Sequence, residues 1–233
     1  MTNEFFVERL FEALIAGDRP ASRRVVEDAC GRGATPEQLV SDIFWPTYEI
    51  IQRSHREDRM TTLAHHLATR LLRVLVDQAA ANFTAQPTNA RTIFAVCGPT
   101  DADELAAQMA VDLLEAQGFS VAFAGGGIAR DEILEQVQER RPDILLLFAS
   151  APNDLPNIRT LVDTMHEIGA CRETQIAVGG GVFNRAEGLA EEIGADVWAT
   201  SPTELVAVLA NKVHQRARAD QRTVGRKRRR EAA

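Results

Sequence analysis

Residues 92–127 read TIFAVCGPTDADELAAQMAVDLLEAQGFSVAFAGGG, and this stretch decides the fold. It opens with a short β-rich run at Thr92–Val96, continues through a helix-forming segment at Glu104–Gln117, and returns to a second β-rich run at Ser120–Ala124. Short apolar runs that alternate with longer helical stretches are typical of parallel strands joined by crossover helices. The stretch therefore predicts a strand–helix–strand unit.

The same alternation continues through most of the remaining sequence. Further strands are expected at Ile144–Phe148, Gln175–Val178 and Val197–Trp198, and further helices at Asp131–Arg140, Leu155–Ile168, Arg185–Ile193 and from Thr203 onward. The strands are nearly continuous in apolar residues, which indicates a parallel sheet covered by helices on both faces. Five such units predict a flavodoxin-like (Rossmann-like) α/β domain with a five-stranded parallel sheet in the order 2-1-3-4-5.

The residues before this domain read as helices. Apolar residues recur at helical spacing in a first segment that ends at Gly17-Asp18, and a second helix is expected over Pro20–Cys30. The sequence Thr35-Pro36-Glu37-Gln38 is a capping-box start signal for a third helix, which Pro46 should kink or split. A fourth helix is expected over Thr61–Asn82. Four helices with short loops predict a four-helix bundle.

These patterns divide the chain into four parts. A helical bundle cap covers residues 1–83, a polar linker covers 84–90, an α/β domain covers 91–218, and a basic tail covers 219–233. The tail has no apolar periodicity, so we expect it to be disordered.

Composition limits the classes of partner. The net charge is −7 over 233 residues, so nucleic acid is not an expected partner except through the basic run Arg226–Arg230. Cys30, Cys97 and Cys171 are far apart and match no zinc or disulfide spacing. The sequence shows neither a signal peptide nor an apolar stretch of ~18 residues, so we expect no membrane partner and a cytoplasmic location.

Three loops should meet where a ligand would bind. In open parallel α/β sheets, ligands bind beyond the carboxyl ends of the strands, close to the switch point in strand order. The loops that follow the first, second and fourth strands are expected at that edge, and their candidate cofactor-binding residues are Thr100, Asp101, Asp103, Gly125, Gly126, Gly179, Gly180 and Gly181. Glycines allow a bulky ligand to approach the backbone closely.

The chemistry of these loops leaves two interpretations open. Asp101 and Asp103 could bind a hard cation, or they could cap the helix that follows them, and the two roles are compatible. No glycine run matches a dinucleotide-binding or P-loop motif. No Ser/His/Asp, Cys/His or GxSxG arrangement indicates a catalytic centre, so an enzymatic role is not expected.

Three of the five histidines lie at one end of the predicted bundle. His55 falls at the end of the third helix, and His65 and His66 fall at the start of the fourth. A single bundle histidine is usually a surface or core residue, whereas three at one end could hold a metal or the metal of a cofactor. His55, His65 and His66 are therefore the candidate metal ligands.

The order of these parts resembles the cobalamin-binding module, a four-helix cap followed by a flavodoxin-like domain. Such modules occur in corrinoid methyl-carrier proteins, methionine synthase and light-sensing B12-dependent repressors. The resemblance spans roughly Phe5 to Val213, and it rests on Glu12–Asp18, Leu67–Thr69, Gly118–Val121 with Ala124-Gly125, Val178–Gly181 and Gly194–Trp198. It implies a cobalamin cofactor between cap and α/β domain, with haem, another tetrapyrrole or no cofactor as alternatives.

The sequence departs from the family pattern at the residues that bind the cofactor. The family's DxHxxG motif falls on Asp101–Ala106, where the cobalt-binding histidine is replaced by Asp103. Its SxL motif falls near Phe148–Ser150, so Ser150 is a further candidate cofactor-binding residue, although it is displaced by about two positions and Phe148 adds bulk where the nucleotide tail should pass. The Trp and Glu-His of the light-sensing branch fall on His55 and on His65-His66.

Three functions follow from this resemblance. The first is a sensor or regulatory protein that binds a corrinoid, or another tetrapyrrole, without the usual lower histidine. The second is an interaction scaffold that has lost its ligand, and the third is a corrinoid methyl carrier. The expected partners are a second copy of the chain, a regulator or a methyltransferase.

Overall fold

The computed structural model describes residues 3–169, 171–218 and 221, so the basic run Arg226–Arg230 lies outside the described residues. The N-terminal region is helical, as expected. Its elements are α1 (Asn3–Ile15), α2 (Arg19–Cys30), α3 (Pro36–Gln38), a π-helical segment η1 (Leu39–Phe44), α4 (Trp45–Arg56) and α5 (Thr62–Ala80). In the described part of the chain, no helix is long and apolar enough to cross a membrane.

The α/β domain follows a stretch without regular structure. Its strands are β1 (Thr92–Cys97), β2 (Ser120–Gly126), β3 (Ile144–Phe148), β4 (Gln175–Gly179) and β5 (Val197–Trp198). Its helices are α6 (Asp101–Ala116), α7 (Arg130–Arg140), the 3₁₀ turn η2 (Pro152–Asp154), α8 (Leu155–Ile168), α9 (Gly181–Arg185), α10 (Leu189–Ile193) and α11 (Pro202–Asn211). All strand pairs are parallel, and the order β2-β1-β3-β4-β5 confirms the predicted topology.

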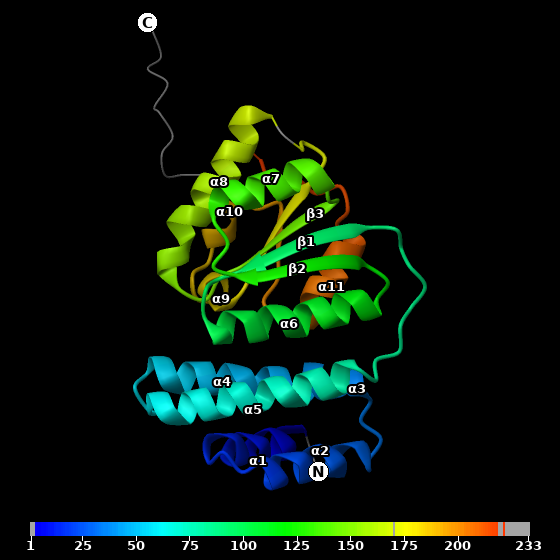
Figure 1. Cartoon of the computed structure of the whole chain (residues 1–233), viewed down its shortest axis with the longest axis vertical. Coiled ribbons are helices and arrows are strands. Elements are labelled where there is room, and N and C mark those ends of the chain that lie inside the picture. Colours follow the sequence, from blue (N-terminus) through cyan, green and yellow to red (C-terminus); the bar gives the residue numbers. More distant parts are fainter. Residues whose placement is uncertain (1–2, 170, 219–220, 222–233) are drawn as a thin grey trace, which may run out of the picture.

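Apolar side chains on both faces of each central strand explain the layers. Phe94, Val96 and Leu147 face a core formed with α7 and α8, whereas Ala95 and Leu146 face a core formed with α6 and α11. Figure 1 shows α7 and α8 on one side of the sheet and α6 and α11 on the other. The near-continuous apolar strands are therefore buried on both faces, as a parallel sheet requires.

Helix α6 lies between the sheet and the cap, so it is buried on two sides (Figure 1). Its residues Leu105, Ala106 and Met109 belong to the core of the cap, while Ala107 and Ala110 belong to the core of the sheet. The Tyr48 hydroxyl of α4 donates a 3.0 Å hydrogen bond to the Ala102 carbonyl in the first turn of α6. These contacts hold the cap against α6, with the Tyr48 bond at the end of α6 that follows the β1 loop.

Two sequence predictions need correction. The third helix does split near Pro46, but it does so through a π-helical segment in which the Trp45 N–H donates to the Val40 carbonyl. Pro46 has no N–H with which to continue the regular ladder. The single helix expected over Arg185–Ile193 is wrong: α9 and α10 are separate, and Gly188 between them has a left-handed φ of 77°.

Candidate functional site

The carboxyl ends of three neighbouring strands lie side by side. Cys97 at the end of β1 pairs with Phe148 at the end of β3, and Phe148 pairs with Gly179 at the end of β4. The loops that begin at Gly98, Ala149 and Gly180 therefore share one edge of the sheet, which the sequence predicted for the loops after β1 and β4. Gly125 and Gly126 are the exception, because they lie within β2 and not in the loop that follows it.

The Thr100–Asp103 segment forms the start of α6. The Thr100 hydroxyl donates to Asp103 Oδ2 at 2.6 Å, and it accepts from the Asp103 N–H at 3.1 Å. This capping box fits the helix-capping interpretation for Thr100 and Asp103. Asp101 is exposed, and its carbonyl accepts a 3.1 Å hydrogen bond from Arg73 of the cap.

A second carboxylate faces Asp103 across Gly98. A Cβ atom on Gly98 would lie 2.6 Å from Asp103 Oδ2 and 3.0 Å from Asp154 Oδ2, so the close approach of both carboxylates requires glycine there. Asp103 is 1% exposed, and Asp103 Oδ1 and Asp154 Oδ2 have no hydrogen-bond partner among the described residues. Burial and the neighbouring Asp103 charge raise the pKa of Asp154. Sequence reasoning missed Asp154, because only the fold brings it to Asp103.

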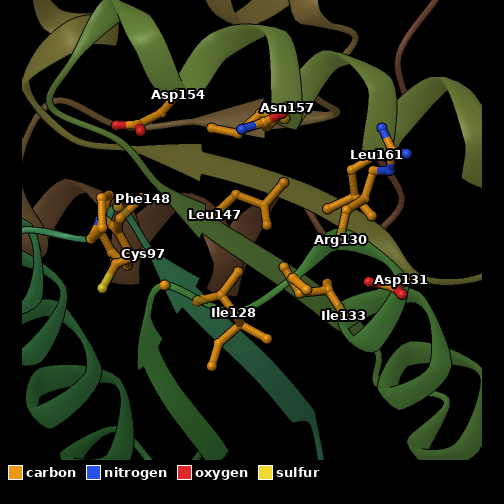
Figure 2. Close-up of a pocket in the computed structure, with 16 residues that line it drawn as sticks. Cys97, Ile128, Arg130, Asp131, Ile133, Leu147, Phe148, Asp154, Asn157 and Leu161 are labelled. Atoms are coloured by element: carbon orange, nitrogen blue, oxygen red, sulfur yellow. The ribbon is translucent and has the colours of Figure 1, made fainter.

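A cavity of about 660 Å³ opens beside these carboxylates (Figure 2). It lies over the ends of β1 and β3, between α7 and α8, on the face of the sheet that Val96 and Leu147 occupy. The labelled side chains in Figure 2 include the apolar Ile128 and Ile133 and the polar Arg130, Asp131, Asp154 and Asn157. The cavity thus combines an apolar interior with a few polar groups, as ligand sites usually do.

The glycine loop after β4 is built for close contact. Gly180 has a φ of 105°, and a Cβ there would lie 2.3 Å from the Ala149 carbonyl oxygen. A Cβ on Gly179 would lie 3.0 Å from the Phe148 ring, which is 7% exposed and packs into the core shared with α6 and α11. Phe148 thus fills the space behind the loop, as its bulk suggested. Ser150 follows this strand and is half-buried.

Arg185 covers the same loop, and the sequence did not indicate it. The Arg185 guanidinium donates to the Ser150 carbonyl at 2.6 Å, which ties the loop after β3 to α9. A Cβ on Gly181 would lie 2.8 Å from Arg185 Nη1, so glycine at this position lets the guanidinium lie against the loop.

The three cap histidines lie close together but do not form a shared metal site. The rings of His55 and His65 stack with centroids 4.0 Å apart, and His65 Nε2 lies 3.2 Å from Gln52 Oε1. His66 is exposed and meets His65 edge-on. Stacked rings direct their in-plane nitrogen lone pairs away from a common point. Within the described ranges, no group of three His, Cys, Asp or Glu side chains could hold a metal ion. Coordination of a metal, or of the metal of a cofactor, by His55, His65 or His66 stays a prediction.

The protonation of His65 is consistent with a single ligand role. Burial, together with the nearby His55 and His66, lowers the pKa of His65 to about 4. The imidazole is therefore neutral at pH 7, which is the form that binds metals.

Comparison with known proteins identifies the two parts of the chain. Two models described as B12 binding domain match it, one over residues 91–209 and the other over residues 7–79. Two curated relatives from Methanosarcina acetivorans are dimethylamine corrinoid protein 1, 26% identical over 107 residues, and trimethylamine corrinoid protein 2, 27% identical over 106 residues. Each match covers 46% of this chain and spans about half of the relative, 49% and 48% respectively.

A solved structure shares the whole architecture. The monomethylamine corrinoid protein of Methanosarcina barkeri superposes with a TM-score of 0.77 over 89% of this chain and 98% of its own, at 14% identity. Identity at this level shows the fold alone. The family models and the corrinoid-protein relatives together support cobalamin as the cofactor. With both its cap and its α/β domain matched, the chain belongs to the B12-binding domain family.

Proposed function

We propose that the chain is a sensor or regulatory protein that binds a corrinoid between its cap and its α/β domain without a histidine from the α/β domain. One observation carries this proposal: Asp103 stands where the resemblance implies the cobalt-binding histidine, and its carboxylate is buried in the capping box of α6. A carboxylate that is already bonded to Thr100 does not replace an imidazole as a ligand of cobalt.

The site fits a corrinoid only in part. The glycine loop at Gly179–Gly181 presents backbone without side chains at the edge of the sheet, which suits a large flat ligand. The lower-ligand position does not fit, and the Phe148 ring fills space against Gly179 that a buried nucleotide tail would need. We therefore assign no role to a lower protein ligand. His55 or His65 remains the candidate to approach the cobalt from the cap.

A corrinoid methyl carrier that works with a methyltransferase is the second candidate. It is favoured by the curated relatives, which are dimethylamine and trimethylamine corrinoid proteins. The resemblance implies that the missing histidine supports cycling of cobalt between oxidation states, so its loss favours the regulatory role. Self-association and a regulator as partner belong to the first candidate.

Visible spectra of the purified protein test the proposal. The protein is incubated with adenosyl-, methyl- and hydroxocobalamin, in the dark and in light, with haem in parallel. We expect a bound cobalamin whose spectrum is unchanged by Asp103→Ala and shifted by His55→Ala or His65→Ala. If haem binds and no cobalamin does, the cofactor is haem and the proposed corrinoid is contradicted. If no cobalamin changes the spectrum or the melting temperature, the remaining hypothesis is the interaction scaffold that has lost its ligand, since a ligand of the native state must raise apparent stability.

Methyl transfer decides between the first two candidates. A protein that binds methylcobalamin, releases its methyl group to a thiol and is remethylated repeatedly would be a carrier. We expect methylcobalamin bound to the protein to transfer its methyl group to the thiol no faster than free methylcobalamin does.

A further inference from the structure

A groove of about 290 Å³ separates α4 from the loops after β3 and β4. Trp45, Tyr48 and Arg56 line it from the cap, while Ser150 and Arg185 line it from the α/β domain. It therefore lies beside the glycine loop, but none of its cap residues was a candidate from the sequence.

An aromatic pair forms the apolar wall of this groove. The rings of Trp45 and Tyr48 stack with centroids 5.3 Å apart and an interplanar angle of 27°. Tyr48 is held in place by its hydrogen bond to the Ala102 carbonyl, so this wall is part of the rigid contact between cap and α6.

Arginines line the groove from both sides, Arg53 and Arg56 from α4 and Arg185 from α9. Arg185 is fixed by the Ser150 carbonyl, and Arg56 extends from the last turn of α4. Among the residues that the structure describes, neither forms an ion pair. Burial and the charge of Arg56 lower the pKa of Arg185, which shows that the two like charges repel each other.

One carboxylate, that of Glu49, also lines the groove. Glu49 is half-buried, and burial raises its pKa, while Arg53 and Arg56 act in the opposite direction. Two guanidinium groups beside an aromatic wall, with no ion pair among the described residues, are unexpected in a chain with a net charge of −7. Paired arginines recognise phosphate through parallel hydrogen bonds.

We propose that Arg56 and Arg185 bind the phosphodiester of the corrinoid's nucleotide loop, which stays in the groove outside the α/β domain. This inference rests on the proposed function. The corrin side chains of cobalamin are uncharged amides, so the phosphodiester is the anionic group at its periphery. Asp103 and Phe148 stand at the positions through which the resemblance implies that the nucleotide tail enters the α/β domain, so the proposal keeps the nucleotide loop on the outside.

The test compares two corrinoids on the full chain. Cobalamin carries the phosphate and the base, whereas cobinamide lacks both and keeps the corrin ring. Visible titrations give the Kd of each for the wild type, Arg56→Gln, Arg185→Gln and the control Arg24→Gln, an exposed arginine on α2. We expect Arg56→Gln and Arg185→Gln each to weaken cobalamin binding about tenfold, the loss of one charge-assisted contact. Cobinamide binding should change less than about twofold.

The outcomes separate this inference from the proposed function. If both corrinoids bind but the variants weaken them equally, or weaken neither, the phosphate assignment is overturned and the proposed function stands. If neither corrinoid binds, both are overturned. Arg185→Gln also removes the tie to Ser150, so Arg56→Gln, which has no such bond, must show the same selective loss. Inorganic phosphate should compete with cobalamin for the protein but should not compete with cobinamide. If phosphate raises the melting temperature of the protein and cobalamin does not displace it, the groove binds a separate phosphate ligand and the assignment is overturned.

Discussion

The Thr100 hydroxyl and the Asp103 carboxylate are joined by a 2.6 Å hydrogen bond, and the Asp103 N–H returns to the same hydroxyl at 3.1 Å. This reciprocal pair occupies the position where the resemblance implies a cobalt-binding histidine. It closes the first turn of α6, the helix that contacts both the sheet and the cap. The position has therefore a structural role that does not depend on a cofactor.

Thr100→Ala should destabilise the fold more than an ordinary loss of a helix cap. The change removes the acceptor for the Asp103 N–H and leaves a buried carboxylate without its hydroxyl donor. We expect a loss of about 2 kcal/mol in the free energy of unfolding, against about 1 kcal/mol for a simple cap. The control is Thr61→Ala, since Thr61 caps α5 at an exposed site by accepting from the Ala64 N–H. Equal losses in urea unfolding would show that the Asp103 carboxylate gains nothing from Thr100.

Bound cobalt should keep the cofactor's own base as its lower ligand, because Asp103 supplies no nitrogen. Cob(II)alamin has one unpaired electron, and an axial ¹⁴N splits its electron paramagnetic resonance lines into triplets. With uniformly ¹⁵N-labelled protein and unlabelled cofactor, we expect triplets. Doublets would show that a nitrogen of the labelled protein is bound to the cobalt, and they would contradict a retained base. If the doublets then disappear in His65→Ala, that nitrogen comes from His65 of the cap.

Two glycines that follow different strands, Gly127 after β2 and Gly180 after β4, should differ in how well they tolerate a methyl group. Gly180 and Gly127 both have positive φ values, 105° and 75°. A Cβ at Gly180 meets the Ala149 backbone at 2.3 Å, whereas a Cβ at Gly127 meets nothing within 4 Å. Gly127→Ala should cost about 1 kcal/mol for its backbone conformation alone. Gly180→Ala should cost several-fold more and weaken corrinoid binding, because the loop must move. Similar unfolding curves for both variants would contradict this packing.

The architecture could be predicted from the sequence because a strand that is buried on both faces consists of a continuous run of apolar residues. The apolar run Ile144–Phe148 and the pair Val197–Trp198 are strands with the predicted bounds. The sequence pattern did not predict the π-helical turn before Pro46 or the break at Gly188. Each depends on which backbone hydrogen bonds form, and more than one local conformation could satisfy the same residues. Local composition also cannot tell a glycine within an edge strand, such as Gly125, from one in the following loop.

The candidate site was less accessible, for a physical reason. Loop positions at strand ends could be named, because parallel topology brings them to one edge. Asp154 and Arg185 could not, since each acquires its partner only through tertiary contact: Asp154 across Gly98, and Arg185 at the Ser150 carbonyl. Histidines grouped by sequence did come together, but the stacking of His55 on His65 is a matter of ring orientation, which spacing does not encode.

Asp112 should make the fold less stable as the pH rises through about 6. It lies on α6 and is 9% exposed, and its Oδ2 has no partner among the described residues, while Gln108 donates to Oδ1 at 2.5 Å. Burial, opposed by the Gln108 bond and assisted by the charges of Glu115 and Asp77, raises its pKa from 3.8 to about 6. Since the folded-state pKa exceeds the unfolded value, the protonated form favours folding, and that stability is lost as pH rises through about 6.

Asp112→Asn should therefore stabilise the protein at pH 7.5 and not at pH 3.5. The amide oxygen can still accept from Gln108, and the cost of burying a charge disappears. We expect a gain of up to about 3 kcal/mol at pH 7.5, equivalent to a two-unit pKa shift. The gain should shrink between pH 6 and 4, because the wild-type carboxyl becomes neutral there. Thermal unfolding at both pH values measures it, with Asp131→Asn on the exposed start of α7 as the control. A gain that persists at pH 3.5 would show that packing, and not the buried charge, sets the energy at this position.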